Sequence, residues 1–188
     1  MTTILRATYD SPLGDFVLAA DGEALVGGWF TGQKHFGSKL GEMTDDDTAP
    51  VFARARRWLD RYFAGDRPEP RELPIRPAGS EFRRAVWGIL LRIPVGEVTT
   101  YRDIAREVAA GRGLASMSSQ AVGGAVGQNP ISIIIPCHRV VGADGSLTGY
   151  AGGLERKIAL LDLEGVDVDG LAQAVGGVTR PLSTERRA

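Results

Sequence analysis

Residues 133–142 read Ile-Ile-Ile-Pro-Cys-His-Arg-Val-Val-Gly and contain the only cysteine of the 188-residue chain. The apolar, β-branched run that opens this stretch predicts a buried strand, which the proline then interrupts. A thiol reacts as thiolate, and His138 and Arg139 are residue types that lower the pKa of a neighbouring cysteine from about 8.5 toward neutral pH. Cys137 is therefore a candidate nucleophile, and the alternative is an inert buried thiol beside a core histidine.

The pentapeptide Pro-Cys-His-Arg-Val at 136–140 resembles the active-site signature of the O6-alkylguanine-DNA alkyltransferases (methylated-DNA-protein-cysteine methyltransferases). The similarity runs from about Ser80 to Gly165, with Asn-Pro at 129–130 and Gly-Tyr-Ala-Gly-Gly at 149–153. So specific a motif argues against the inert thiol. The resemblance implies DNA repair by direct reversal, in which the alkyl group of O6-alkylguanine passes irreversibly to Cys137, once per protein molecule and without a cofactor. O4-alkylthymine is a candidate second substrate.

The composition is that of a globular protein, with 22 basic and 23 acidic residues and a net charge of −1. A charge near zero argues against strong binding of nucleic acid through bulk electrostatics, but the cations crowd the second half, so we expect modest, salt-sensitive DNA binding. We find no apolar run near 18 residues and no secretory leader in this sequence, which predicts a cytoplasmic protein without a membrane span. A single cysteine predicts no disulfide and no cysteine-rich metal site. We expect a monomer.

The N-terminal part predicts a small α+β domain. Three β-prone runs at 4–9, 16–20 and 25–30 are separated by turn residues, which is typical of an antiparallel meander. Apolar side chains at helical spacing between Val51 and Ala64 predict a helix over one face of that sheet. His35 is expected at the surface. We expect an α+β domain at 1–66, a proline-rich linker at 67–79, a C-terminal domain at 80–166 and a disordered tail at 167–188. The resemblance implies a ribonuclease H-like fold for the first domain.

The C-terminal part predicts a mostly helical domain. Ser80 and Thr100 are N-cap candidates for helices that run to about Ile93 and Ala109, and a third helix is expected from about Ser119 to Gln128. Two short helices joined by a glycine-containing loop are typical of a helix-turn-helix. The turn-rich residues 142–149 occupy the place of a wing, and a last helix is expected at 154–164, with Leu154, Ile158 and Leu161 inward. The predicted fold class is thus α+β, with a winged helix-turn-helix domain that carries the active site.

The third helix carries few long polar side chains, which gives it a smooth face suited to a narrow groove. By resemblance it enters the minor groove of double-stranded DNA. The positions that match DNA-contacting ones are Ser118, Ser119, Gln120, Ala121 and Gly123, and we add Arg139 as a cation that binds DNA or supports the site. Many relatives carry an arginine at position 120, inserted where the damaged base is flipped out; glutamine fills that gap without the positive charge. The loop from Ala109 to Met117 is longer than usual in the family.

The resemblance also assigns the chemistry. Cys137 is the nucleophile, His138 deprotonates it through a water molecule, and Glu164 orients His138. Tyr101 donates a proton to the leaving guanine, and Asn129 ties the active-site loop to the helix-turn-helix. The residues that match the guanine pocket are Val140, Tyr150, Ala151 and Gly152. No metal ligand is expected.

Two other classes remain open. A DNA-binding sensor of the same fold would bind alkylated DNA without transfer, although such family members lack the cysteine. A cysteine hydrolase would need converging cysteine and histidine side chains with an oxyanion hole, and it would turn over. The N-terminal part has no cysteine cluster, which argues against a zinc-dependent phosphotriester-repair role.

Overall fold

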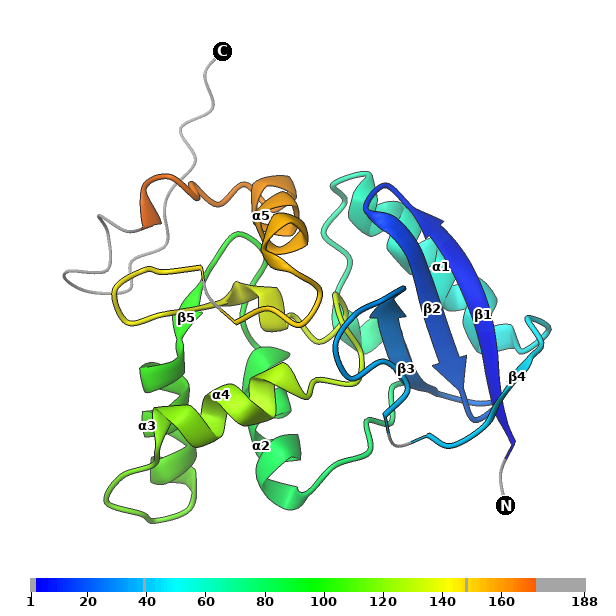
Figure 1. The fold of residues 1–188 in the computed structure, drawn as a ribbon. Helices are drawn as coiled ribbons and strands as arrows, with labels where there is room; N and C mark the ends of the chain where they lie inside the picture. Colours follow the sequence, from blue (N-terminus) through cyan, green and yellow to red (C-terminus); the bar gives the residue numbers. More distant parts are fainter. Residues whose placement is uncertain (1–2, 39, 148, 172–188) are drawn as a thin grey trace.

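The computed structural model describes residues 3–38, 40–147 and 149–171 (Figure 1). Its N-terminal part is a four-stranded sheet in the order β3-β2-β1-β4. The strands are β1 (Ile4–Ser11), β2 (Gly14–Ala20), β3 (Leu25–Phe30) and β4 (Met43–Asp45). The expected meander is confirmed, because β1 pairs antiparallel with β2 and β2 with β3. The short β4, which pairs parallel with β1, was not expected.

Helix α1 (Pro50–Phe63) covers one face of this sheet, as its apolar spacing predicted (Figure 1). Phe52, Ala55 and Leu59 lie three or four residues apart and are fully buried, since that spacing places them on one side of a helix. The chain leaves the helix through Gly65, whose φ of 88° favours glycine. A one-turn helix η1 (Pro70–Glu72) then interrupts the proline-rich segment.

The C-terminal part contains α2 (Glu81–Leu90), α3 (Tyr101–Gly111), α4 (Ser119–Gly127) and α5 (Leu154–Leu163). Ser80 and Thr100 cap α2 and α3 as expected, and Ser118 caps α4 by accepting from the Ala121 N–H. Helix α4 packs against both α2 and α3. Two short strands, β5 (Thr99–Thr100) and β6 (Val140–Val141), pair in parallel.

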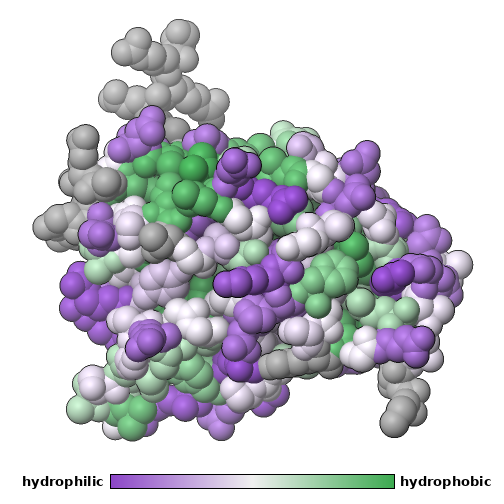
Figure 2. Space-filling model, viewed as in Figure 1, coloured by the Kyte–Doolittle hydropathy of each residue, from purple (hydrophilic) through white to green (hydrophobic). Residues whose placement is uncertain are grey.

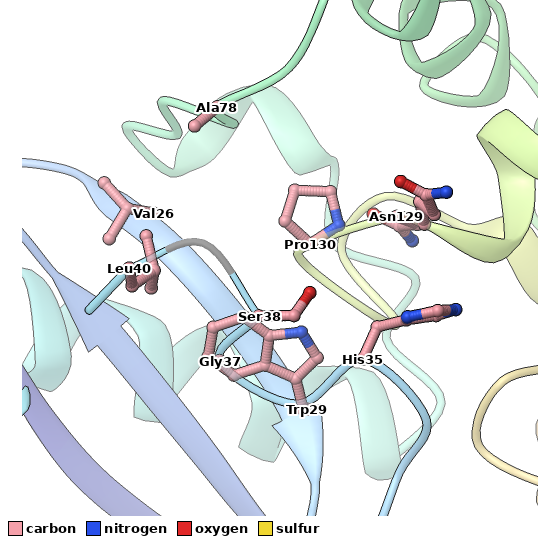
Figure 3. Close-up of a pocket in the computed structure, with 10 residues that line it drawn as sticks. Val26, Trp29, His35, Gly37, Ser38, Leu40, Ala78, Asn129 and Pro130 are labelled. Atoms are coloured by element: carbon pink, nitrogen blue, oxygen red, sulfur yellow. The ribbon is translucent and has the colours of Figure 1, made fainter. Parts of the chain in front are cut away.

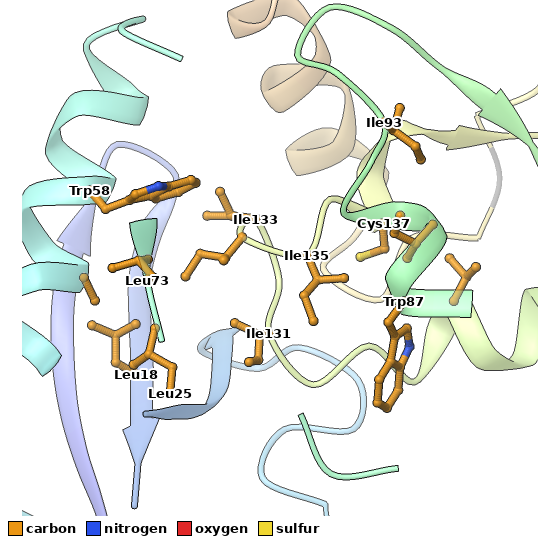
Figure 4. Close-up of a cluster of buried hydrophobic side chains, with 14 of the residues drawn as sticks. Leu18, Leu25, Trp58, Leu73, Trp87, Ile93, Ile131, Ile133, Ile135 and Cys137 are labelled. Carbon is orange, nitrogen blue, oxygen red and sulfur yellow. The ribbon is translucent and has the colours of Figure 1, made fainter. Parts of the chain in front are cut away.

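The isoleucine run before the cysteine does not form the predicted strand. Ile133 has a φ of 68°, and the N–H groups of Ile134 and Ile135 donate locally to Ser132 and Ile131, which closes a turn. The run is apolar because it is buried between two layers. In Figure 4 its side chains extend from Leu18 and Leu25 of the sheet toward Trp87 and Cys137. Burial on all sides thus produced a strand-like sequence without strand pairing.

Strand β3 holds this turn in place. The Gly28 N–H donates to Pro130 O at 2.9 Å, and the Ser132 N–H donates back to Gly28 O at 2.8 Å. Beyond the strand, the buried amide of Gln33 donates from Nε2 to Ser132 Oγ at 2.8 Å. The segment that leads to the cysteine is therefore hydrogen-bonded to the N-terminal sheet.

The last helix and the segment after it differ from expectation. Leu161 is buried as predicted, but Leu154 is 52% exposed and Ile158 is only half-buried. Lys157 and Leu160 complete the inward face of α5. Leu171, in the predicted tail, is only 2% exposed and packs against Val141 and Leu161. Residues 167–171 therefore belong to the packed structure, whereas 172–188 lie outside the described residues. Hydrophobic side chains gather over α5 and the segment after it (Figure 2).

The loop after β6, expected as a wing, begins with a tight turn. The Gly142 N–H donates to Ser146 O at 2.8 Å, and Asp144 Oδ1 accepts from the Ser146 N–H at 3.0 Å.

Within the described ranges, no helix has the length and apolarity needed to cross a membrane. Across the same residues, no three His, Cys, Asp or Glu side chains converge as metal ligands would.

Candidate active site

Cys137 opens a single turn of 3₁₀ helix, η2 (Cys137–Arg139), and is 5% exposed. Asn129, two residues beyond the end of α4, donates from Nδ2 to Cys137 Sγ at 3.0 Å and to Ile135 O at 2.7 Å. Its Oδ1 accepts from the Ile131 N–H at 3.0 Å. One amide therefore connects the end of α4, the isoleucine turn and the sulfur, as the predicted tie requires.

The surroundings of the Cys137 thiol shift its pKa in both directions. Burial raises the pKa of Cys137, whereas the hydrogen bond from Asn129 and the charge of Lys157 lower it. Lys157 is fully buried on α5 and donates from Nζ to Val140 O at 2.6 Å. Burial lowers the pKa of Lys157 to about 8, and the negative charge of Cys137 acts in the opposite direction. From the sequence we counted Lys157 among the cations that crowd the second half of the chain, and the signal missed was its place on the inward face of α5.

His138 and Glu164 form a buried pair, as the resemblance implied. His138 Nε2 lies 2.7 Å from Glu164 Oε1, and both side chains are almost completely buried. Burial alone would raise the pKa of Glu164, but His138 and Arg139 hold it well below its usual range. Burial lowers the pKa of His138. Because an ionised carboxylate only accepts, neutral His138 carries its proton on Nε2 and keeps a lone pair on Nδ1, a buried atom with no hydrogen-bond partner among the described residues.

Arg139 does not lie where a DNA-binding residue would. It is 4% exposed and donates from Nε and Nη2 to the two oxygens of Glu164, at 2.8 and 2.9 Å. Its third contact is from Nη1 to Ile93 O at 2.6 Å. We therefore withdraw Arg139 as a DNA contact, because its guanidinium forms a bidentate ion pair with Glu164 inside the protein. The supporting role that we held open for it fits this geometry.

The side chain of Tyr101, the first residue of α3, packs closely against the backbone of two glycines. A Cβ on Gly149 would lie 2.9 Å from the Tyr101 hydroxyl, and one on Gly123 would lie 3.8 Å from its ring. Burial raises the pKa of Tyr101, and the negative charge of Cys137 raises it further. The phenol therefore stays protonated near neutral pH and can act as a donor.

Residues 150–152 contact His138, the loop after β3 and helix α5. The Tyr150 ring meets the His138 ring edge-on, with centroids 6.4 Å apart. The Lys34 N–H donates to Ala151 O at 3.2 Å, and Arg156 donates from Nη1 to Gly152 O at 3.0 Å. Of the predicted pocket residues, Tyr150 and the buried Val140 therefore lie beside the cysteine-containing turn, whereas the backbone oxygens of Ala151 and Gly152 accept from Lys34 and Arg156.

The residues of α4 that we matched to DNA contacts lie mostly on its exposed face. Ser118, Ser119, Gln120 and Ala121 are exposed and Gly123 is half-buried, while Val122 and Val126 point into the core. Exposure makes the outward residues available to a partner.

Figure 3 shows a small cavity, of about 30 Å³, where the loop after β3 meets the end of α4. Its walls include Trp29, His35, Asn129 and Pro130. His35 is exposed, as expected, and is the one ionisable side chain among the lining residues. The cavity therefore lacks the paired groups that acid–base or nucleophilic chemistry needs.

Known proteins resemble the chain over most of its length. Residues 4–77 match the family described as "6-O-methylguanine DNA methyltransferase, ribonuclease-like domain", and residues 81–166 match "6-O-methylguanine DNA methyltransferase, DNA binding domain". The chain is 39% identical over 164 residues to a methylated-DNA–protein-cysteine methyltransferase of Haemophilus influenzae, covering 87% of this chain and 88% of that one. It is 45% identical over 158 residues to the protein of that name from Mycolicibacterium paratuberculosis, with 84% and 90% coverage. Mycobacterium tuberculosis OGT, solved in complex with DNA, superposes with a TM-score of 0.75 at 39% identity, over 89% of this chain and 98% of that one.

Proposed function

Since the chain belongs to the 6-O-methylguanine DNA methyltransferase family, we propose that Cys137 is the residue that accepts the alkyl group. The resemblance read from the pentapeptide is confirmed, and the chain is a methylated-DNA–protein-cysteine methyltransferase that repairs O6-alkylguanine in DNA by transfer of the methyl group to a cysteine. The observation that carries the assignment to Cys137 is the hydrogen bond from Asn129 to its sulfur, since a donor at 3.0 Å favours the thiolate form.

The transfer is a displacement at the alkyl carbon. The Cys137 thiolate attacks that carbon, a sulfur–carbon bond forms, and the bond from the carbon to guanine O6 breaks. The electron pair stays on the guanine, which takes a proton from the Tyr101 hydroxyl. The thiol proton passes to His138 Nδ1 through a water molecule, while Glu164 keeps Nε2–H oriented. The thioether product has no means of regeneration in this site, so each molecule acts once and without a cofactor.

DNA binding completes the proposal. Helices α3 and α4 form the helix-turn-helix of a C-terminal domain at 80–166, the loop that begins after β6 is its wing, and α4 enters the minor groove. Ser118, Ser119, Ala121 and Gly123 face the sugar-phosphate backbone, and a small-residue face suits binding without sequence preference. The damaged guanine is flipped out at a cost of a few kcal/mol and enters a pocket lined by Val140, Tyr150, Ala151 and Gly152. Gln120 fills the vacated place.

The protein acts as a cytoplasmic monomer in this proposal, with O4-alkylthymine as a second substrate. Intact-mass measurement after incubation with duplex DNA that contains O6-methylguanine tests it. We expect one methyl increment per chain, mapped by peptide analysis to Cys137. A methyl group on another residue would overturn the assignment of Cys137, and catalytic release of methanol, with guanine restored in the DNA and no mass increase of the protein, would point to a hydrolase.

A further inference from the structure

The carboxylate of Glu164 accepts hydrogen bonds from three different side chains. His138 Nε2 and the hydroxyl of Tyr62 both donate to Oε1, each at 2.7 Å, and Arg139 spans both oxygens. Glu164 is 2% exposed, so the protein rather than bulk water provides its donors. The oxygen that orients His138 is thus shared with a phenol.

Tyr62 comes from α1, on the N-terminal side of the molecule, 102 residues away in the sequence. Its ring is buried, stacks on Trp58 with centroids 5.5 Å apart, and meets Phe63 edge-on at 5.3 Å. The neighbouring rings leave the hydroxyl little freedom to turn away. Burial raises the pKa of Tyr62 well above its ordinary value, and the negative charge of Glu164 raises it further. Tyr62 is therefore a neutral, immobile donor throughout the working pH range.

We propose that Tyr62 is a positioning residue for the alkyl transfer: its hydroxyl fixes Oε1 of Glu164, which in turn fixes the ring and the proton of His138. This inference rests on the proposed function. It also gives the N-terminal sheet and α1 a part in the chemistry, since α1 supplies a donor to the pair that activates the nucleophile. Tyr62 acts through Glu164 and touches neither the sulfur nor the substrate.

The effect of removing the hydroxyl has a definite sign. Oε1 would lose one of its donors, so its negative charge would interact more strongly with a protonated His138. His138 would then stay protonated to a higher pH, and the neutral form that accepts the thiol proton would appear later. The charged and titratable groups around the pair of His138 and Glu164 are Arg139, Lys157, Cys137, Tyr62 and Tyr150. Only Tyr62 changes in this experiment.

The test is Tyr62→Phe, which keeps the ring and its stack on Trp58. Single-turnover transfer from free O6-benzylguanine, which needs no DNA, is measured from about pH 5 to 9 and well below the melting temperature of each variant. We expect the rate to fall about fivefold near neutral pH, equivalent to one neutral hydrogen bond, and the acid-side midpoint to rise by about 0.5 pH. A purely structural role would lower the melting temperature and leave the midpoint in place.

Tyr9→Phe is the matched control. The Tyr9 hydroxyl donates at 2.8 Å to Oδ1 of Asp60, a carboxylate on α1. Because Tyr9 does not bond to Glu164, removing its hydroxyl should leave the midpoint unchanged. Replacing Tyr62 by 4-aminophenylalanine retains an N–H donor and should restore the original midpoint. The inference is overturned if Tyr62→Phe has the same midpoint as the unsubstituted protein, or if the amine fails to restore it. The proposed function fails separately, if the unsubstituted protein gains no benzyl group on Cys137.

Discussion

Glu164→Gln should destabilise the protein strongly, because it removes the charge that compensates a buried guanidinium. Arg139 donates to both oxygens of Glu164, and both side chains are almost inaccessible to solvent. Removing one partner of a buried ion pair costs about 3 to 5 kcal/mol, a large part of the 5 to 15 kcal/mol that stabilises a typical domain. Glu107→Gln is the control: Glu107 pairs with Arg92 on the surface, and an exposed pair is worth less than about 1 kcal/mol.

The same substitution should remove an acid dependence of stability. The pKa of Glu164 is lowered in the folded protein, so its contribution is complete above the unfolded pKa of about 4.3 and is lost as the pH falls toward the folded value. Urea unfolding of the unsubstituted protein between about pH 7 and pH 3 should show this loss. The unfolding free energy of the Gln variant should be lower at pH 7 and should decrease less as the pH falls.

Transfer should slow as well, by about 10- to 100-fold, since the charged acceptor of the His138 Nε2–H would become a neutral and weaker amide oxygen. The rate is measured in single turnover on free O6-benzylguanine, without denaturant and at a pH where both proteins are folded. The reasoning is refuted if Glu164→Gln loses no more unfolding free energy than Glu107→Gln, or if its acid dependence matches that of the unsubstituted protein.

Three further predictions concern other parts of the molecule. Lys157→Met should move the pH midpoint of Cys137 alkylation by iodoacetamide upward, because the thiolate loses a buried cation; an unchanged midpoint would remove Lys157 from the account. Gln120→Ala should slow transfer from duplex DNA by the equivalent of about 1 to 3 kcal/mol and leave free O6-benzylguanine unaffected, and equal losses on both would mean that Gln120 only supports α4. Leu171→Ala should lower the unfolding free energy by about 2 to 5 kcal/mol in urea titrations, whereas the exposed Leu154→Ala should change it little; equal effects would contradict the packing of Leu171.

The sequence predicted those features that depend on local patterns. Periodic apolar residues located α1, and the side chains of Ser80 and Thr100 do cap α2 and α3. The pairing of His138 with Glu164 followed from the resemblance, because a family motif carries geometry that one sequence alone does not reveal.

Other features depend on contacts between distant segments, which periodicity does not report. The isoleucine run is buried from both sides, and burial of that kind gives the same residue types in a turn as in a strand. Tyr62 fits a core stripe, and only the fold shows that its hydroxyl meets Glu164. Lys157 was counted only among the cations of the second half of the chain and Leu171 as part of a tail, because composition does not show which side chains the neighbouring elements cover.

The central claim, that Cys137 accepts the alkyl group, is tested most directly by peptide mass mapping after reaction with O6-methylguanine duplex, run beside Cys137→Ser. A serine hydroxyl has a similar shape but is a far weaker nucleophile. We predict one methyl group on the peptide that contains Cys137, never more than one per chain, and none on the serine variant, which should still bind the duplex. Methyl transfer to the serine variant at any residue, or an unmodified Cys137 in a protein that has repaired the DNA, would contradict the account.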